Sequence, residues 1–426
     1  MNPGLSSRTK KIVDELDPTP LTLAPQQTQR PSTIDLSNAQ NEVVRRELLD
    51  VFKHVDDGEL LIAKQIFALP TVPGGDPRLR RNLAEFFNTY SNPLQPVQRE
   101  HIVLTAGASD AIEHVIYAVC DDGDSILVPG PFWPGIEYLA SSWANVNIIV
   151  AEPPTYTNYA SYLVPSLQAA YDFSPVKGRI KAVLLTNSSN PLGRCYPRDV
   201  LIECLEFCQE RELHLISDEL YALTELGHIK KGEEFVSVLS LTDPFLPEGA
   251  IKVDPNRVHI VWSASKLFGV SGLRIGCLVS QHNRELIRAM ALLTTAHANT
   301  ISTLYFSSLL SSSYLPTLLA LNSERLTASY RVLADWLHKR SIEFVQPTHG
   351  LFVFARLAKD LRTMEQDTSY FAQLPQTGLK VSPGHSYQGK EGELGWARIR
   401  FSIGEELMRK VVAKLDAIFE QQGRSA

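Results

Sequence analysis

Short apolar runs recur along the chain between residues 102 and 280 and are separated by longer amphipathic stretches. Several runs are apolar at consecutive positions and rich in β-branched residues, which is typical of strands buried on both faces of a parallel sheet. Residues 111–119 and 198–209 instead show the i, i+4 spacing of amphipathic helices. The expected strands lie at 102–104, 125–128, 146–150, 181–186, 213–217, 258–262 and 274–280. This alternation predicts an α/β fold with a mostly parallel central sheet flanked by helices.

The pattern changes after about residue 315. A long helical stretch at 318–340 leads to short segments and then to a second helical stretch at 405–421. The short segments, expected as strands, lie at 342–345, 351–357, 378–382 and 397–402. This arrangement is typical of a separate, smaller α+β domain. The predicted units are a large domain over residues 56–315, a small domain over 31–55 and 316–426, and an N-terminal arm over 1–30.

Composition and charge narrow the class of protein. Apolar residues make up 44% of the 426 residues and charged residues 21%, which is ordinary for globular proteins. The net charge is −6 and no basic cluster is present. Such a chain offers no cluster of positive charges that a nucleic-acid backbone would bind. We therefore expect an enzyme-sized globular protein that binds no nucleic acid.

The N-terminal residues and the cysteines bear on location and metal binding. The first twenty residues lack the apolar core of a secretory signal, and Asp14, Glu15 and Asp17 argue against a mitochondrial presequence. No apolar run is long enough to cross a bilayer. Cys204 and Cys208 permit a metal pair, but their apolar helical face favours core packing. We expect a cytoplasmic protein without a membrane segment or a metal site.

The most specific segment of the chain is VHIVWSASKLFGVSGLRIGCLVS, residues 258–280. An apolar strand here leads to Lys266, at the carboxyl end of a strand, where α/β sheets bind ligands. A lysine beside apolar walls has a lowered pKa and can form a Schiff base. Ser263, Ser265 and Arg274 are spaced to converge on one phosphate. Taken alone, this segment fits a surface-loop lysine equally well.

Polar residues also follow other predicted strands. The segment at 107–109 opens a helix, so its backbone N–H groups can bind an anion, although an ordinary strand-to-helix turn fits as well. Asn190 precedes a proline and on its own indicates only a turn. Asp218 follows a strand, with Tyr221 three residues later. A carboxylate there fits a helix cap, a metal ligand or a partner for a ring nitrogen.

In this order and spacing, the segments GAS, NPLG, SDELY and SASK, with an arginine eight residues after the lysine, resemble a known family. They are similar to fold-type-I pyridoxal-phosphate enzymes, the aspartate aminotransferase superfamily. The resemblance extends from about Ile34 to Phe419. It implies the fold-type-I architecture, pyridoxal 5'-phosphate as cofactor, a small amino-acid substrate and a homodimer.

The resemblance also implies roles for individual residues. Lys266 would be the Schiff-base lysine and the proton shuttle at the substrate Cα, and Asp218 would keep the pyridinium nitrogen protonated. Asn190 and Tyr221 would hydrogen-bond the 3-oxygen of the ring, on which Trp133 would stack. The residues expected around the phosphate are Gly107, Ala108, Ser109, Ser263, Ser265 and Arg274.

One arginine near the C-terminus matches the family residue that binds the substrate α-carboxylate. Arg398, in ELGWARIRFS, is the expected bidentate partner. Arg400 is the competing choice, because alternation along a strand points both side chains to the same face. Residues 295–304 contain no arginine, where dicarboxylate-specific transaminases place one. Specificity for aspartate or glutamate is therefore not expected.

Segments such as IDLSNAQNEVVRREL and GGDPRLRRNLAEFFN are most similar to the 1-aminocyclopropane-1-carboxylate synthase branch. By this likeness Asn41 is expected to bind substrate. True synthases carry Ala-Glu-Asn where this chain has Gln40 in the middle position, so a carboxylate is lost. They also carry a tyrosine, which reaches the neighbouring subunit, where this chain has Pro73. Both departures argue against cyclopropane formation from S-adenosylmethionine.

Three functions remain open. The chain could be an aminotransferase, or it could catalyse elimination or replacement at Cβ or Cγ, as a C–S lyase or synthase does. Both reactions begin with Schiff-base formation and removal of the Cα proton. The third possibility is a catalytically silent binding protein on the same fold, which predicts the loss of a key residue. Lys266, Asp218, Tyr221 and Arg398 are all present, which favours an enzyme.

Overall fold

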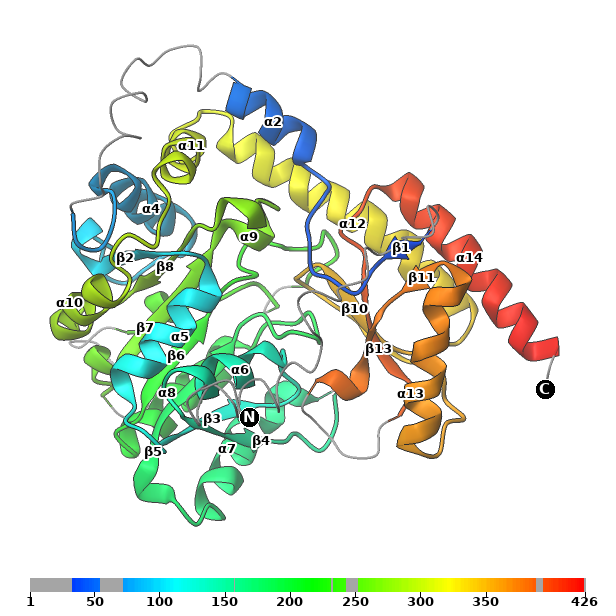
Figure 1. The fold of residues 1–426 in the computed structure, drawn as a ribbon, viewed down its shortest axis with the longest axis horizontal. Coiled ribbons are helices and arrows are strands. Elements are labelled where there is room, and N and C mark those ends of the chain that lie inside the picture. Colours follow the sequence, from blue (N-terminus) through cyan, green and yellow to red (C-terminus); the bar gives the residue numbers. More distant parts are fainter. Residues whose placement is uncertain are drawn as a thin grey trace, which may run out of the picture.

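A seven-stranded sheet forms the centre of the larger part of the molecule in the computed structural model, which describes residues 33–53, 72–156, 158–230, 233–242, 252–387 and 394–424 (Figure 1). Its strands are β2 (Ile102–Thr105), β3 (Ser125–Pro129), β4 (Asn147–Ala151), β5 (Ile180–Thr186), β6 (His214–Asp218), β7 (Val258–Ser263) and β8 (Gly276–Val279). They are ordered β2-β8-β7-β6-β5-β3-β4, and of these seven β8 alone runs antiparallel to the strands on either side. The predicted mostly parallel sheet is confirmed.

Helices cover both faces of this sheet (Figure 1). They are α4 (Pro77–Tyr90), α5 (Ala108–Val119), α6 (Gly135–Ser142), α7 (Leu163–Asp172), α8 (Arg198–Glu210) and α10 (Arg284–Leu293). The short helix α9 (Ala264–Leu267) follows β7, and α11 (Thr300–Leu310) packs against α4. In β5, Val183 and Leu185 join the apolar cluster that contains α7 and α8, while Ala182 and Leu184 join the cluster that contains α5, α6 and α10. Burial on both faces explains why this strand is apolar at consecutive positions.

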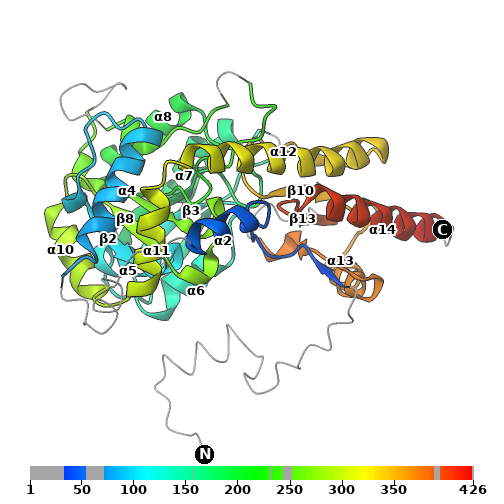
Figure 2. The same cartoon turned by 90° about the horizontal axis from the view of Figure 1, so that it is seen from above.

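A four-stranded antiparallel sheet forms the centre of the smaller part. Its strands are β9 (Phe344–Val345), β10 (Phe352–Arg356), β12 (Ser382–Pro383) and β13 (Trp396–Arg400), in the order β12-β13-β10-β9. The accompanying helices are α12 (Leu315–Lys339), α13 (Met364–Gln373) and α14 (Glu405–Arg424). Figure 2 shows α12 and α14 running side by side.

The N-terminal part of the described chain joins this smaller sheet region. β1 (Ile34–Asp35) pairs in parallel with β11 (Leu379–Lys380), and α2 (Arg45–Lys53) follows. The prediction of one strand over 378–382 is therefore wrong, because its first half pairs with β1 and its second half, as β12, joins β13. The predicted domain boundaries stay a prediction, and the predicted arm lies outside the described residues.

Two sequence predictions concern apolar segments. Cys204 and Cys208 are free and buried on α8, so the core-packing interpretation is confirmed. Among the described residues, no single helix is long and apolar enough to cross a membrane. Helices α11 and α12 satisfy length and composition only as a pair bent by 90°. Leu304, Phe306 and Leu309 of α11 are buried inside the protein.

Two histidines form a buried polar chain across β6 and β7. His214 Nδ1 lies 2.9 Å from His259 Nε2, and His259 Nδ1 lies 3.0 Å from the hydroxyl of Ser280. Burial lowers the pKa of His214 to about 4, helped by the charge of Arg257. Burial, with the neighbouring His214, lowers the pKa of His259 to about 3. Folding therefore favours both rings in the neutral form.

We expect this pair to make the protein sensitive to acid. The stability it contributes is present above the unfolded pKa of about 6.5 and is lost as the pH falls from there toward the folded values. For His259 alone the loss at about pH 5.5 is on the order of 1 kcal/mol. Thermal unfolding at about pH 7.5 and about pH 5.5 should show a smaller drop in melting temperature for His259→Gln, which does not titrate. An equal drop in both proteins would contradict the prediction.

Candidate active site

A cavity of about 410 Å³ lies at the carboxyl ends of β5, β6 and β7, where it meets residues of the smaller sheet region. This edge of a parallel sheet is where α/β proteins bind ligands. Most of the residues predicted as a site line this one cavity. They are Ala108, Ser109, Trp133, Asn190, Asp218, Tyr221, Ser263, Ser265, Lys266, Arg274 and Arg398. Residues separated by up to 290 positions are thus gathered around a single space.

Lys266 enters the cavity from the short helix α9. The hydroxyl of Ser263 accepts a hydrogen bond from the N–H of Ser265 and so starts this helix directly after β7. Lys266 Nζ donates to the carbonyl of Ala39 at 3.0 Å. Burial, together with the positive charge of Arg398, lowers the pKa of Lys266 to about 8. The amine is therefore closer to its neutral, nucleophilic form than a surface lysine.

Asp218 occupies the end of the neighbouring strand, β6. Its side chain accepts a hydrogen bond from the N–H of Leu220 at 3.2 Å and is buried. Burial raises the pKa of Asp218 to about 7, opposed by that hydrogen bond and by the charge of Lys266. A cation placed against this carboxyl would favour its ionised form. Asp218 is thus suited to hold a protonated ring nitrogen.

The start of α5 and the loop before β8 form a tight backbone cup. Gly107 has φ +97°, and a Cβ there would lie 2.6 Å from Nη2 of Arg274. A Cβ on Gly276 would lie 2.5 Å from the backbone carbon of Gly107. Arg274 Nη2 donates to the carbonyl of Ala106 at 2.6 Å. Glycine at both positions lets the guanidinium and the helix N-terminus approach one point, which favours an anion there.

Hydroxyl groups complete the donor set of the cup. Ser263 and Ser265 lie side by side, with their hydroxyl oxygens 2.8 Å apart. Ser109, in the first turn of α5, also lines the cavity. The cup therefore offers hydroxyls, backbone N–H groups and one guanidinium, the donors that a phosphate dianion binds. Gly107 does not line the cavity itself, but it shapes this cup.

The structure distinguishes the two arginines of β13. Arg398 lines the cavity, where Nη1 donates to Asn190 Oδ1 at 2.9 Å and Nη2 to the carbonyl of Ser37 at 2.6 Å. Arg400 does not line it and instead forms an ion pair with Glu42 at 2.8 Å. In both arginines the buried Nε lacks a hydrogen-bond partner. This atom therefore does not distinguish Arg398 from Arg400. Position at the cavity favours Arg398 as the carboxylate ligand.

Aromatic side chains form the remaining walls. Trp133 is 40% exposed, and Gly135 leaves room for its ring, because a Cβ there would lie 2.2 Å from the indole. Tyr387 lies against the guanidinium of Arg398, 5.4 Å from ring centre to Cζ. Burial raises the pKa of Tyr221, which keeps its hydroxyl protonated and able to donate. These rings make the wall apolar but leave hydroxyl donors at its edge.

The predicted substrate-binding role of Asn41 finds no support in its position. Its side chain is fully buried, and its amide donates to the carbonyl of Leu267 at 3.0 Å and to Asn322 Oδ1 at 2.7 Å. The amide therefore ties the N-terminal segment to α9 and α12 and does not line the cavity. Gln40 is exposed and also lies away from the cavity. Neither residue offers a side chain to a ligand there.

Sequence reasoning missed the segment at 37–39. It lines the cavity, and its carbonyl oxygens at Ser37 and Ala39 accept hydrogen bonds from Arg398 and Lys266. Backbone acceptors leave no residue-type signal in the sequence. Ala39, which lines the cavity, is the first residue of the AQN segment, whose Gln40 and Asn41 do not line it.

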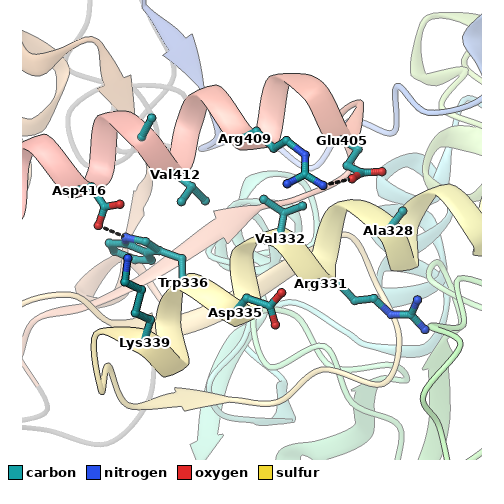
Figure 3. Close-up of a pocket in the computed structure, with 11 residues that line it drawn as sticks. Ala328, Arg331, Val332, Asp335, Trp336, Lys339, Glu405, Arg409, Val412 and Asp416 are labelled. Carbon is teal, nitrogen blue, oxygen red and sulfur yellow. Dashed lines mark hydrogen bonds and ion pairs between the residues drawn. The ribbon is translucent and has the colours of Figure 1, made fainter.

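A second and larger hollow lies far from this chemistry. A groove of about 610 Å³ lies between α12 and α14. Figure 3 shows side chains that line it. Its floor includes Val332 and Val412, and its rim carries the contact of Trp336 Nε1 with Asp416 at 2.8 Å. The charged side chains that line this groove are spread along α12 and α14 and do not converge on one point. The groove is larger than the cavity around Lys266, but the convergent donors select the smaller cavity.

Comparisons with known proteins identify relatives over most of the chain. The family model described as aminotransferase class I and II matches residues 33–415. A probable aminotransferase, aclI, of Aspergillus oryzae is 34% identical over 98% of this chain and 99% of its own length. The 1-aminocyclopropane-1-carboxylate synthase 7 of Arabidopsis thaliana is 30% identical over 79% of this chain and 74% of its own.

Solved structures share the fold at lower sequence identity. A double mutant of Thermus thermophilus aspartate aminotransferase superposes with a TM-score of 0.75 and 21% identity, covering 96% of this chain and 98% of that one. This likeness concerns the fold alone. Together with the match over residues 33–415, it agrees with the resemblance found in the sequence. The chain belongs to the aminotransferase class I and II family.

Proposed function

We propose that this protein is a pyridoxal-phosphate-dependent aminotransferase that acts on a small amino acid or amino-acid conjugate. The observation that supports it most is the buried Lys266, which shares one cavity with Asp218 and Arg398. An amine nucleophile, an anion for a ring nitrogen and a guanidinium for a carboxylate are the three groups this chemistry requires. Cytoplasmic location and a homodimer stay predictions from the sequence.

The residues present fit the cofactor. The cup around Gly107 and Gly276 would be filled by any added Cβ, so it leaves backbone N–H groups and Arg274 free to approach a phosphate. Ser263 and Ser265 add hydroxyl donors beside Lys266. When bound, pyridoxal phosphate supplies a carbonyl carbon that amines attack and a ring that accepts the electron pair released at Cα.

The chain's own residues divide the remaining work. Arg398 would fix the substrate by its α-carboxylate and thereby orient the Cα–H bond. Lys266 Nζ, with its pKa lowered to about 8, would take the proton from Cα and return it at a neighbouring carbon. Asp218 would keep the ring nitrogen protonated, and the hydroxyl of Tyr221 would donate to the ring oxygen. Transamination would require Lys266 to deliver the proton to the cofactor, whereas elimination would require a leaving group to depart from Cβ or Cγ of the substrate.

A half-reaction assay tests this proposal. The purified holoenzyme is mixed with single amino acids and no 2-oxo acid. For an aminotransferase we expect the visible cofactor band to give way to the near-ultraviolet band of the amine form, with one 2-oxo acid formed per site. Adding a 2-oxo acid should restore the visible band. The stoichiometry distinguishes a single half-reaction from repeated turnover.

Two outcomes would overturn the proposal in different ways. Repeated release of ammonia or a thiol without an acceptor, with the visible band retained, would indicate elimination at Cβ or Cγ. Failure to bind pyridoxal phosphate at all would exclude both reactions and favour a silent binding protein.

A further inference from the structure

Three side chains with metal-binding atoms meet beside the first turn of α5. Asp110 and His114 are four residues apart and lie on one face of this helix, while His297 comes from the segment between α10 and α11. His297 Nδ1 lies 3.0 Å from Asp110 Oδ1, and His114 Nδ1 lies 3.2 Å from the same oxygen. The ligand atoms of all three residues lie within 4.8 Å of one another.

We propose that Asp110, His114 and His297 form a binding site for a divalent transition-metal ion, with Zn²⁺ as the best match. A tetrahedral ion with bonds of about 2.0–2.1 Å holds its ligand atoms about 3.3 Å apart. Two of the observed separations, 3.0 and 3.2 Å, are close to this value, and the third, between the two histidines, is at most 4.8 Å. A ligand set of two imidazoles and one carboxylate is typical of zinc sites, whereas calcium and magnesium bind mainly oxygen ligands.

The surroundings of the three residues suit an ion. The N–H of Ala106 donates to Asp110 Oδ2 at 2.7 Å, which fixes the carboxylate as an outer-shell partner does in metal sites. The side chains of Asp110 and His114 are 13% exposed and that of His297 is 36% exposed, so an ion can enter from solvent. Three protein ligands leave a fourth position for water.

The same contacts also describe a histidine–carboxylate cluster without an ion. His114 Nδ1 lies 2.8 Å from the carbonyl of Asp110, so it donates there when it carries the proton. Metal binding needs the other tautomer, in which the lone pair of Nδ1 faces the carboxylate. The two descriptions differ in one measurable respect, because only a metal site binds zinc in a fixed ratio of ions to protein chains.

An ion at this position would join two parts of the molecule. It would link α5, whose N-terminus belongs to the phosphate cup, to the segment that carries His297, 187 residues away in sequence. The hydroxyl of Thr294, in the same segment, already hydrogen-bonds the carbonyl of Leu104 at 3.3 Å. Zinc should therefore raise the melting temperature of the protein.

Zinc uptake by the holoenzyme tests the site. The protein is dialysed against a chelator, titrated with ZnCl₂ and freed of unbound metal, and the zinc bound per chain is measured together with the melting temperature. We expect one zinc per chain and a raised melting temperature. The variant His297→Ala should bind zinc at least about tenfold more weakly and lose the rise in melting temperature. His297 is exposed, so this change should not impair folding.

The control is His338→Ala, which removes another exposed histidine on α12. It should bind zinc as the wild type does. Equal binding by His297→Ala, or no zinc uptake by the wild type at about 10 µM free zinc, would overturn the proposal.

Co²⁺ replaces Zn²⁺ in a second measurement. A charge-transfer band typical of thiolate ligands would place the ion at cysteines and would also overturn it.

Discussion

Replacing Lys266 with alanine should abolish turnover, with kcat reduced roughly 10⁴-fold or more. Among the described residues that line the cavity, the amine of Lys266 is the one nucleophile with a lowered pKa, and it is also the candidate proton shuttle at Cα. Alanine removes both functions but leaves the anion cup around Arg274 in place. Absorbance spectra and steady-state rates measure the change. The visible band that depends on the lysine should disappear even where pyridoxal phosphate still binds.

Two further measurements separate a chemical role from a structural one. Lys177→Ala, which removes an exposed lysine paired with Asp172, should keep the spectrum and the rate of the wild type. A small primary amine added to Lys266→Ala should restore part of the rate, because it can carry the proton that the lost side chain carried. An unchanged visible band in Lys266→Ala would contradict the assignment of this residue.

The sequence predicts the parts of the site that depend on strand ends. Asp218 and Lys266 follow apolar runs that are unmistakably buried strands, and the carboxyl ends of parallel strands meet at one edge. Position along the chain therefore translates directly into position in space. The same reasoning accounts for the correct prediction of the seven-stranded sheet, in which each central strand is apolar at consecutive positions.

Contacts that join distant segments could not be predicted in this way. Asn41 was expected to bind substrate, but its amide is used by Leu267 and Asn322, which depends on how α9 and α12 pack against the N-terminal segment. His297 contacts Asp110 although the two residues are 187 positions apart in sequence, and no local spacing predicts that pair. The two arginines of β13 share a face in sequence, and the structure separates them, because Arg398 lines the cavity whereas Arg400 pairs with Glu42.

Replacing Arg398 with lysine should lower kcat/KM roughly 100-fold, mostly through a higher KM. Arg398 lies at the cavity, held by Asn190 and by the carbonyl of Ser37, with its guanidinium 4.8 Å from the ring of Phe352. Lysine keeps the charge but cannot present two parallel N–H donors to a carboxylate. Steady-state kinetics with a reactive amino acid measure the change, and the visible cofactor band should be unaffected.

Arg400→Lys is the matched control, two residues further along the same strand. Arg400 Nη1 is paired with Glu42 Oε1 at 2.8 Å, and Nη2 donates to the carbonyl of Asp35 at 2.8 Å. Lysine cannot reach both acceptors, so this variant should melt at a lower temperature while its KM stays near that of the wild type. A raised KM in Arg400→Lys together with a normal KM in Arg398→Lys would assign carboxylate binding to the other arginine. The two variants thus separate the arginine that binds substrate from the arginine that stabilises the fold, which alternation along the strand alone cannot do.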